Sequence, residues 1–103
     1  MTWRRFAVSC LAAAAPAAFA QDAPTLATRS LAATCATCHG TDGRALPGAS
    51  VPGLAGVPAE RIVEQVKAFV SGQRPSTVMQ QIAKGYTEAQ IEQVARWFAA
   101  QQP

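Results

Sequence analysis

The chain has 103 residues, half of them hydrophobic, and carries a formal net charge of +3 at neutral pH. This length allows a single domain. The lysines and arginines form no cluster or stripe, which argues against a nucleic-acid partner. The sequence also shows no combination of acid, base and nucleophile typical of a catalytic site, so an enzyme is not predicted.

Residues 1–20 are predicted to be a cleaved secretory signal peptide. Arg4 and Arg5 give a positive start, an apolar run follows, and Ala18 and Ala20 place small residues before the cleavage point. The apolar run is too short to span a membrane, so no membrane anchor is expected. The alternative is an apolar N-terminal core helix.

The domain is therefore expected to comprise residues 21–103 and to function in the periplasm. Without Arg4 and Arg5, the nine basic residues of the chain fall to seven, against six acidic ones. The basic character of the whole chain thus belongs largely to the signal peptide. A domain of about 83 residues is close to the lower limit for a self-sufficient hydrophobic core.

A helix is predicted over residues 26–39. Ala27, Leu31 and Cys35 follow one another at intervals of four residues, so they share one face. We expect this face to pack against another helix.

Cys35, Cys38 and His39 end this helix in a C-x-x-C-H motif, the attachment signature of haem c. Two thiols about one helical turn apart can reach the two vinyl groups on one edge of a porphyrin. The imidazole then lies beneath the iron, where a histidine nitrogen is the usual ligand. We therefore predict one covalent haem c, bound by Cys35 and Cys38, with His39 as an iron ligand.

Other uses of the motif fit less well. A structural zinc site needs four ligands, whereas residues 21–103 offer only these two cysteines and one histidine. A thioredoxin-like redox pair needs a βαβ context, and no alternating strand pattern flanks the motif. A local disulfide remains chemically possible.

The segment 40–56 is rich in glycine and proline and is predicted to be irregular. If this loop covers the His39 side of the porphyrin, a backbone carbonyl near Pro52 can accept a hydrogen bond from the histidine ring, and Leu54 can cover the porphyrin. Histidines that bind metals usually need such a partner. The alternative is a surface loop whose prolines only restrict the chain.

A second helix is predicted from Pro58 to Ser71, with Gly72 as its stop. A short helical piece through Ala83 follows. The second helix has a continuous apolar face that can pack on haem or on the other helices. Its members are Ile62, Val63, Val66, Phe69 and Val70.

Met79 is the only methionine left once Met1 is removed. Most methionines only fill space in a core. If a side chain occupies the sixth iron position, however, a thioether is the favoured choice, so Met79 is predicted as the second axial ligand. Arg74 is a candidate to bind a haem propionate, the alternative being a solvated loop arginine.

The last helix is predicted to begin at a capping box formed by residues 87–90 and to end near Gln101. Trp97 lies on the edge of its apolar stripe. We expect Trp97 to pack over Ala27 and Leu31, where the small alanine lets the two helices cross closely. The alternative is a partly exposed aromatic. The stripe consists of Ile91, Val94, Ala95 and Phe98.

Taken together, the motif at residues 35–40, the turn at 52–56, Met79 and the terminal aromatic helix resemble a short bacterial class I cytochrome c. The resemblance covers essentially all of the domain. It implies a small all-α fold in which the first and last helices cross around one covalently bound haem, with His39 and Met79 as axial ligands. Members of that family often have glycine and an aromatic residue where this chain has alanine and leucine.

A narrower resemblance lies in residues 69–79 and 82–87. These segments are similar to haem domains in the cytochrome subunit of flavocytochrome c sulfide dehydrogenase. The resemblance implies an FAD-containing partner subunit that oxidises sulfide and passes electrons to this chain. Many such subunits carry two haem domains, whereas this sequence has one C-x-x-C-H motif.

The expected function is therefore periplasmic electron transfer. The chain would serve either as a subunit of a sulfide dehydrogenase or as a freely diffusing carrier to another oxidoreductase. A ligand-binding or peroxidatic haem protein, with Met79 weakly bound or displaced, is the remaining alternative.

Overall fold

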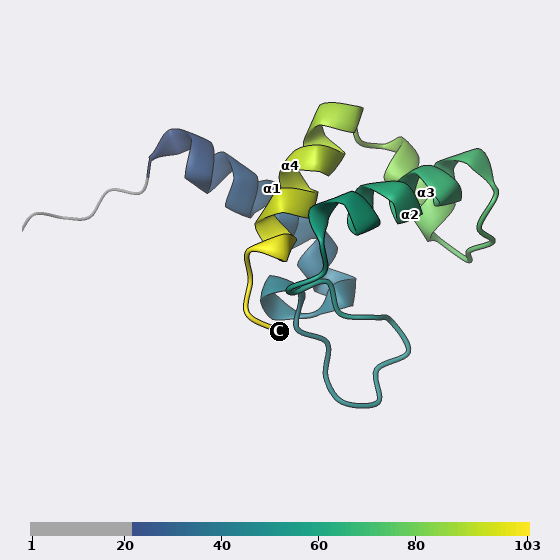
Figure 1. Ribbon diagram of the computed structural model, residues 1–103, viewed down its shortest axis with the longest axis horizontal. Helices are drawn as coiled ribbons and strands as arrows, with labels where there is room; N and C mark the ends of the chain where they lie inside the picture. Colours follow the sequence, from purple (N-terminus) through teal and green to yellow (C-terminus); the bar gives the residue numbers. More distant parts are fainter. Residues whose placement is uncertain (1–21) are drawn as a thin grey trace, which may run out of the picture.

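The computed structural model describes residues 22–103, so the predicted signal peptide at residues 1–20 lies outside the described part. The described residues form four α-helices and one 3₁₀ turn, without strands. In Figure 1, α1 and α4 cross, while α2 lies beside α3 and also packs against α4. The predicted all-α class is confirmed. The elements are α1 (Ala23–His39), η1 (Thr41–Gly43), α2 (Ala59–Ser71), α3 (Met79–Lys84) and α4 (Glu88–Ala99).

Local signals set the ends of α1. The side chain of Asp22 accepts a hydrogen bond from the backbone N–H of Thr25 at 3.2 Å, which satisfies one of the free donors at the helix start. At the other end Gly40 adopts φ 91°, and its N–H donates to the carbonyl of Ala36 at 2.9 Å. The cysteine motif thus occupies the last turns of a well-capped helix.

The predicted limits of α2 and α4 are largely confirmed. Gly72 ends α2 in the left-handed conformation with φ 79°, which glycine adopts without steric cost. Thr87 and Gln90 form the predicted capping box, with backbone-to-side-chain bonds of 3.1 Å and 2.9 Å. The helix ends at Ala99, slightly earlier than predicted. None of the helices described in residues 22–103 has the length and apolar character needed to cross a membrane.

The core is small and lies where α1, α2 and α4 meet. Phe98 is the one large side chain fully buried among residues 22–103. Trp97 and Leu31 pack against the core but are only partly buried. The buried cluster comprises Ala32, Ile62, Val94, Ala95 and Phe98.

The expected crossing point on α1 is wrong by little more than one turn. Ala27 is exposed, whereas Ala32 is 1% exposed and forms part of the core. Near the start of α1 the contact with α4 is polar, because the side-chain amide of Gln93 donates to the hydroxyl of Thr28. Residues at intervals of four drift around a helix with 3.6 residues per turn, so the face that contains Leu31 turns away from α4 at Ala27.

Gly43 fixes the loop 40–56 onto this core. Its carbonyl accepts hydrogen bonds from the N–H groups of Leu54 at 2.8 Å and Ala55 at 3.1 Å. It is buried and has φ 81°. A Cβ at this position would lie 2.7 Å from a ring carbon of Phe98 and 2.7 Å from the nitrogen of Ala55. Only glycine fits between the loop and the core.

We expect Gly43→Ala to lower the free energy of unfolding by about 2–4 kcal/mol, because it combines an unfavourable positive φ with overpacking. Gly48 is a matched control, since it has φ 79° but nothing within 4 Å of the added Cβ. Gly48→Ala should cost only about 1 kcal/mol, from the backbone conformation alone. Denaturant unfolding measures both, and equal losses would contradict the tight contact at Gly43.

Candidate haem site

The last turns of α1 carry two free thiols. Cys35 is half-buried and Cys38 is exposed. Burial raises the pKa of the Cys35 thiol, an effect that the hydrogen bond with Thr34 partly offsets and the nearby Cys38 reinforces. The local disulfide that the sequence left open is not formed in this structure.

His39, the last residue of α1, is held by the loop. Its Nδ1 lies 2.7 Å from the carbonyl oxygen of Pro52, so the hydrogen bond expected near Pro52 is present. A carbonyl oxygen only accepts, so Nδ1 carries the proton and donates it. In the neutral ring Nε2 then has a free lone pair, which is the form of histidine that binds metals.

The loop that delivers this carbonyl is itself tied down. Leu54 bonds to Gly43 through its N–H, and its carbonyl accepts from the N–H of Val57 at 3.2 Å. The Leu54 side chain packs against the buried core. The Pro52 carbonyl is therefore held beside His39 by a loop that backbone bonds fix to the core, and not by the conformational restriction of proline alone.

Met79 is the first residue of α3 and is half-buried. The start of this helix is set by Ser76, whose hydroxyl accepts from the N–H of Gln80 at 3.0 Å. Met79 therefore lies at the junction between the exposed stretch 71–78 and a short ordered helix. Met79 and His39 thus lie on different helices, α3 and α1.

Arg74 turns back onto α2. Its guanidinium lies 4.7 Å from the ring centroid of Phe69 and donates to the side-chain oxygen of Gln65. Its backbone N–H donates to the carbonyl of Ala68 at 3.0 Å. The structure thus associates Arg74 with α2 and not with the cysteine-bearing turn.

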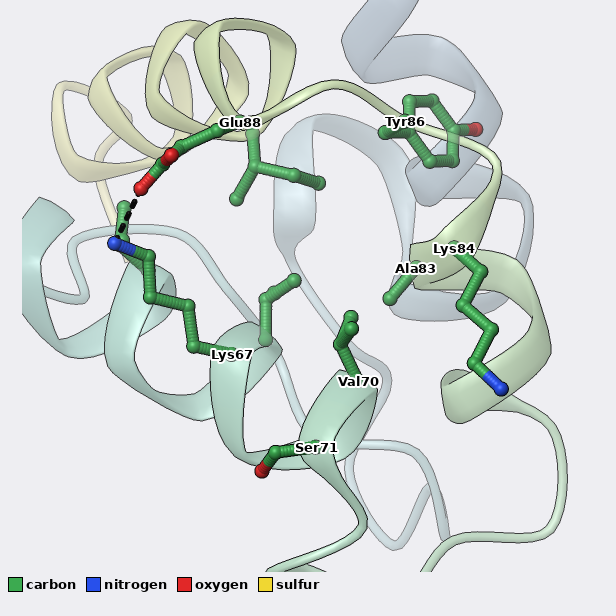
Figure 2. A pocket seen from close by; sticks show the side chains of 10 residues that line it. Lys67, Val70, Ser71, Ala83, Lys84, Tyr86 and Glu88 are labelled. Atoms are coloured by element: carbon green, nitrogen blue, oxygen red, sulfur yellow. Dashed lines mark ion pairs between the residues drawn. The ribbon is translucent and has the colours of Figure 1, made fainter.

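An apolar cavity of about 410 Å³ lies between α2, α3 and the start of α4 (Figure 2). Its rim carries an ion pair that joins α2 to the first turn of α4, with Lys67 Nζ 2.5 Å from Glu88 Oε1. The hydrogen bond and charge of each partner raise the pKa of Lys67 and lower that of Glu88, so both are charged at neutral pH. The lining residues are Val63, Val66, Lys67, Val70, Ser71, Ala83, Lys84, Tyr86, Glu88 and Ile91.

Tyr86 connects this cavity to the cysteine motif, and no sequence pattern singled it out. It lines the cavity, and its hydroxyl lies 2.7 Å from the hydroxyl of Thr34, the residue before Cys35. The two residues are 52 positions apart. Their pairing depends on how the helices pack, so periodicity along the chain gives no sign of it.

The residues present fit a haem. Two free thiols and an imidazole with an uncommitted Nε2 lie together at the end of α1. Several large apolar side chains remain exposed in the loop and around Met79, and a porphyrin would remove such surface from water. By contrast, residues 22–103 contain no cluster of three cysteine, histidine or acidic side chains arranged to hold a metal ion, as a zinc site requires. The large apolar side chains exposed in residues 22–103 are Leu26 (47% exposed), Leu46 (80%), Val70 (40%), Val78 (56%) and Ile82 (42%).

Comparison with known proteins identifies the family of this chain. A sequence model of the cytochrome c family matches residues 26–101. The chain is 36% identical over 103 residues to a thiosulfate dehydrogenase electron acceptor of Thiomonas intermedia, covering 97% of this chain and 45% of that protein. It is 41% identical over 68 residues to the cytochrome subunit of sulfide dehydrogenase of Chlorobaculum tepidum, covering 66% and 60%.

A third relative, cytochrome c-554(548) of Halomonas halodenitrificans, is 33% identical over 72 residues, covering 67% of this chain and 86% of that protein. The chain spans only about half of the Thiomonas protein. The family match nevertheless includes the cysteine motif, the loop at Pro52, Met79 and all of α4. The chain therefore belongs to the cytochrome c family, whose members carry electrons on a covalently bound haem c.

Proposed function

We propose that the chain is a periplasmic electron-transfer protein with one haem c, attached through Cys35 and Cys38 and ligated by His39 and Met79. The observation that carries the proposal is the hydrogen bond from His39 Nδ1 to Pro52 at the end of a helix with two free thiols. That bond leaves Nε2 as the atom able to bind iron. The domain at residues 21–103 and export by the predicted signal peptide complete the proposal.

The haem supplies a metal that exchanges one electron between its ferric and ferrous states. The residues of the chain control the ligands of the iron and its exposure to water. His39 is oriented by Pro52, which restrains the ring and makes Nε2 a better donor. Met79 would supply the second protein ligand, leaving no position open to substrate, and its thioether would favour a high reduction potential. The apolar residues around the site exclude water.

The names of the relatives support one class of electron donor, a dehydrogenase that acts on a reduced sulfur compound. Two of them are named for thiosulfate dehydrogenase and sulfide dehydrogenase, both of which oxidise reduced inorganic sulfur. We infer that this chain accepts electrons from such a dehydrogenase. If sulfide is the substrate, the donor would be an FAD-containing partner subunit, and this chain would be the cytochrome subunit. If thiosulfate is the substrate, the donor would be a separate dehydrogenase, and this chain would be a diffusing electron acceptor.

The proposal predicts that a periplasmic extract of the source cells, given thiosulfate or sulfide, reduces the purified ferric holoprotein. The change in the visible haem spectrum measures the rate. Each sulfur compound without extract is the control, because sulfide can reduce haem directly. Size exclusion of the native protein then separates the two donors, since a co-eluting flavin supports the sulfide dehydrogenase subunit.

Two results would contradict this function. If neither compound speeds haem reduction above the extract-free control, the proposed donor class is wrong. If the haem protein is recovered in the cytoplasmic fraction at its full length, the proposed export is wrong.

A further inference from the structure

In the described residues, the segment that carries Met79 is joined to α1 by one side-chain hydrogen bond. The short helix α3 packs against α2. Among the hydrogen bonds of residues 22–103, the bond between Tyr86 and Thr34 alone joins α1 to the segment 72–86. Tyr86 lies two residues after α3 ends, and Thr34 lies one residue before Cys35. The bond thus spans from the Met79 segment to the cysteine-bearing turn.

The direction of this bond follows from the donors available. The hydroxyl of Thr34 lies 2.7 Å from the backbone carbonyl of Leu31, which can only accept, so Thr34 donates its single proton there. Tyr86 must then donate to Thr34 at 2.7 Å. The acceptor oxygen is therefore held by the backbone of α1. The sulfur of Cys35 lies 3.9 Å from the same oxygen.

The ring of Tyr86 is half-buried and lines the apolar cavity between α2, α3 and α4. In Figure 2 its hydroxyl points away from the middle of the cavity. Packing and the hydrogen bond together fix where α3 ends relative to α1.

We propose that Tyr86 is a positioning residue for the sixth iron ligand. Met79 is the first residue of α3, a helix of six residues, and only Gly85 separates the end of this helix from the Tyr86 anchor. A helix is stiff and rises about 1.5 Å per residue, so an anchor at one end restricts the other. Without the phenol proton, α3 keeps its packing on α2 but loses its tie to the turn that holds His39. The thioether of Met79 then leaves the iron more readily.

The inference rests on the proposed ligation by Met79 and is tested by competition for the iron. Imidazole added to the ferric holoprotein displaces a weakly held thioether, and the loss of the far-red Fe(III)–S(Met) absorption band reports its binding. Tyr86→Phe keeps the ring and removes only the hydroxyl. We expect it to raise the apparent affinity for imidazole about 2- to 10-fold, the range for one net hydrogen bond.

Variants at the other end of the bond sharpen the test. Thr34→Ala should have the same effect as Tyr86→Phe, the double variant little more than either, and Thr34→Ser should restore the original affinity. Ser71→Ala is the matched control, because Ser71 lines the same cavity but its hydroxyl bonds only to nearby backbone, donating to Ala68 and accepting from Gln73, and does not reach α1. It should leave imidazole affinity unchanged.

The possible failures are distinct. A lower thermal midpoint of Tyr86→Phe with unchanged imidazole affinity would show that the bond only stabilises the fold, and would overturn the inference. Absence of the far-red band from the unmodified ferric protein would overturn the proposed Met79 ligation and this inference with it.

Discussion

The Cys35→Ala/Cys38→Ala variant is expected to carry no covalent haem and to lose its cooperative thermal unfolding transition. The described core is small, with Phe98 as its one large fully buried side chain. A chain of this length buries too little apolar surface to offset the conformational entropy of folding by a wide margin. The exposed side chains of Leu46 and Val78 are surface that a porphyrin would cover.

Two measurements check this expectation. A c-type absorption band that survives acid–acetone extraction reports covalent haem and should vanish in the variant. Far-ultraviolet circular dichroism during heating should change from a sigmoid to a shallow slope. Cys38→Ala alone is the control, because the half-buried Cys35 remains for one thioether bond. A haem-free chain that melts cooperatively with native helix content would show that the core is sufficient without haem.

Met79→Ala is expected to abolish the far-red Fe(III)–S(Met) band and to lower the reduction potential. The thioether is the neutral, soft ligand that favours the ferrous state, so its loss leaves the ferric iron relatively more stable. The sixth position then opens. Carbon monoxide should bind the reduced variant promptly and to high occupancy at neutral pH, whereas the unmodified protein should bind it little.

Val78→Ala provides a close control for Met79→Ala. Val78 precedes Met79 and is 56% exposed, so its truncation removes a neighbouring side chain without removing sulfur. It should keep the far-red band and the low reactivity with carbon monoxide. Persistence of the band in Met79→Ala would show that another group ligates the iron. Prompt carbon monoxide binding by the unmodified protein would favour a ligand-binding haem protein over an electron carrier.

The elements that depend on neighbouring residues could be predicted from the sequence. Gly72 ends α2 and Thr87 begins α4 because stop and cap signals act within a few positions. The acceptor for His39 was also predictable, since a ligating histidine needs a partner and the loop at Pro52 is short enough to return to it. The predicted roles in binding haem remain predictions for direct test.

Features that depend on helix packing were not accessible in this way. The crossing at Ala32 instead of Ala27 reflects the angle between α1 and α4, which the alanine pattern alone does not specify. The contact of Arg74 with Phe69 and Gln65 arises because the chain turns back after Gly72. Tyr86 shows no periodic relation to Thr34, so only the assembled helices bring the two hydroxyls together.

The acceptor for His39 is a main-chain oxygen, and this has a consequence for how the protein tolerates change. A carboxylate in that role could be protonated in acid or lost by a single substitution, whereas a peptide carbonyl carries no exchangeable proton and is present whatever residue stands at position 52. The hydrogen-bond acceptor of His39 is therefore the same at every pH and does not depend on a side-chain atom at position 52. The position of this acceptor is set by the path of the backbone, which Gly43 holds against the core.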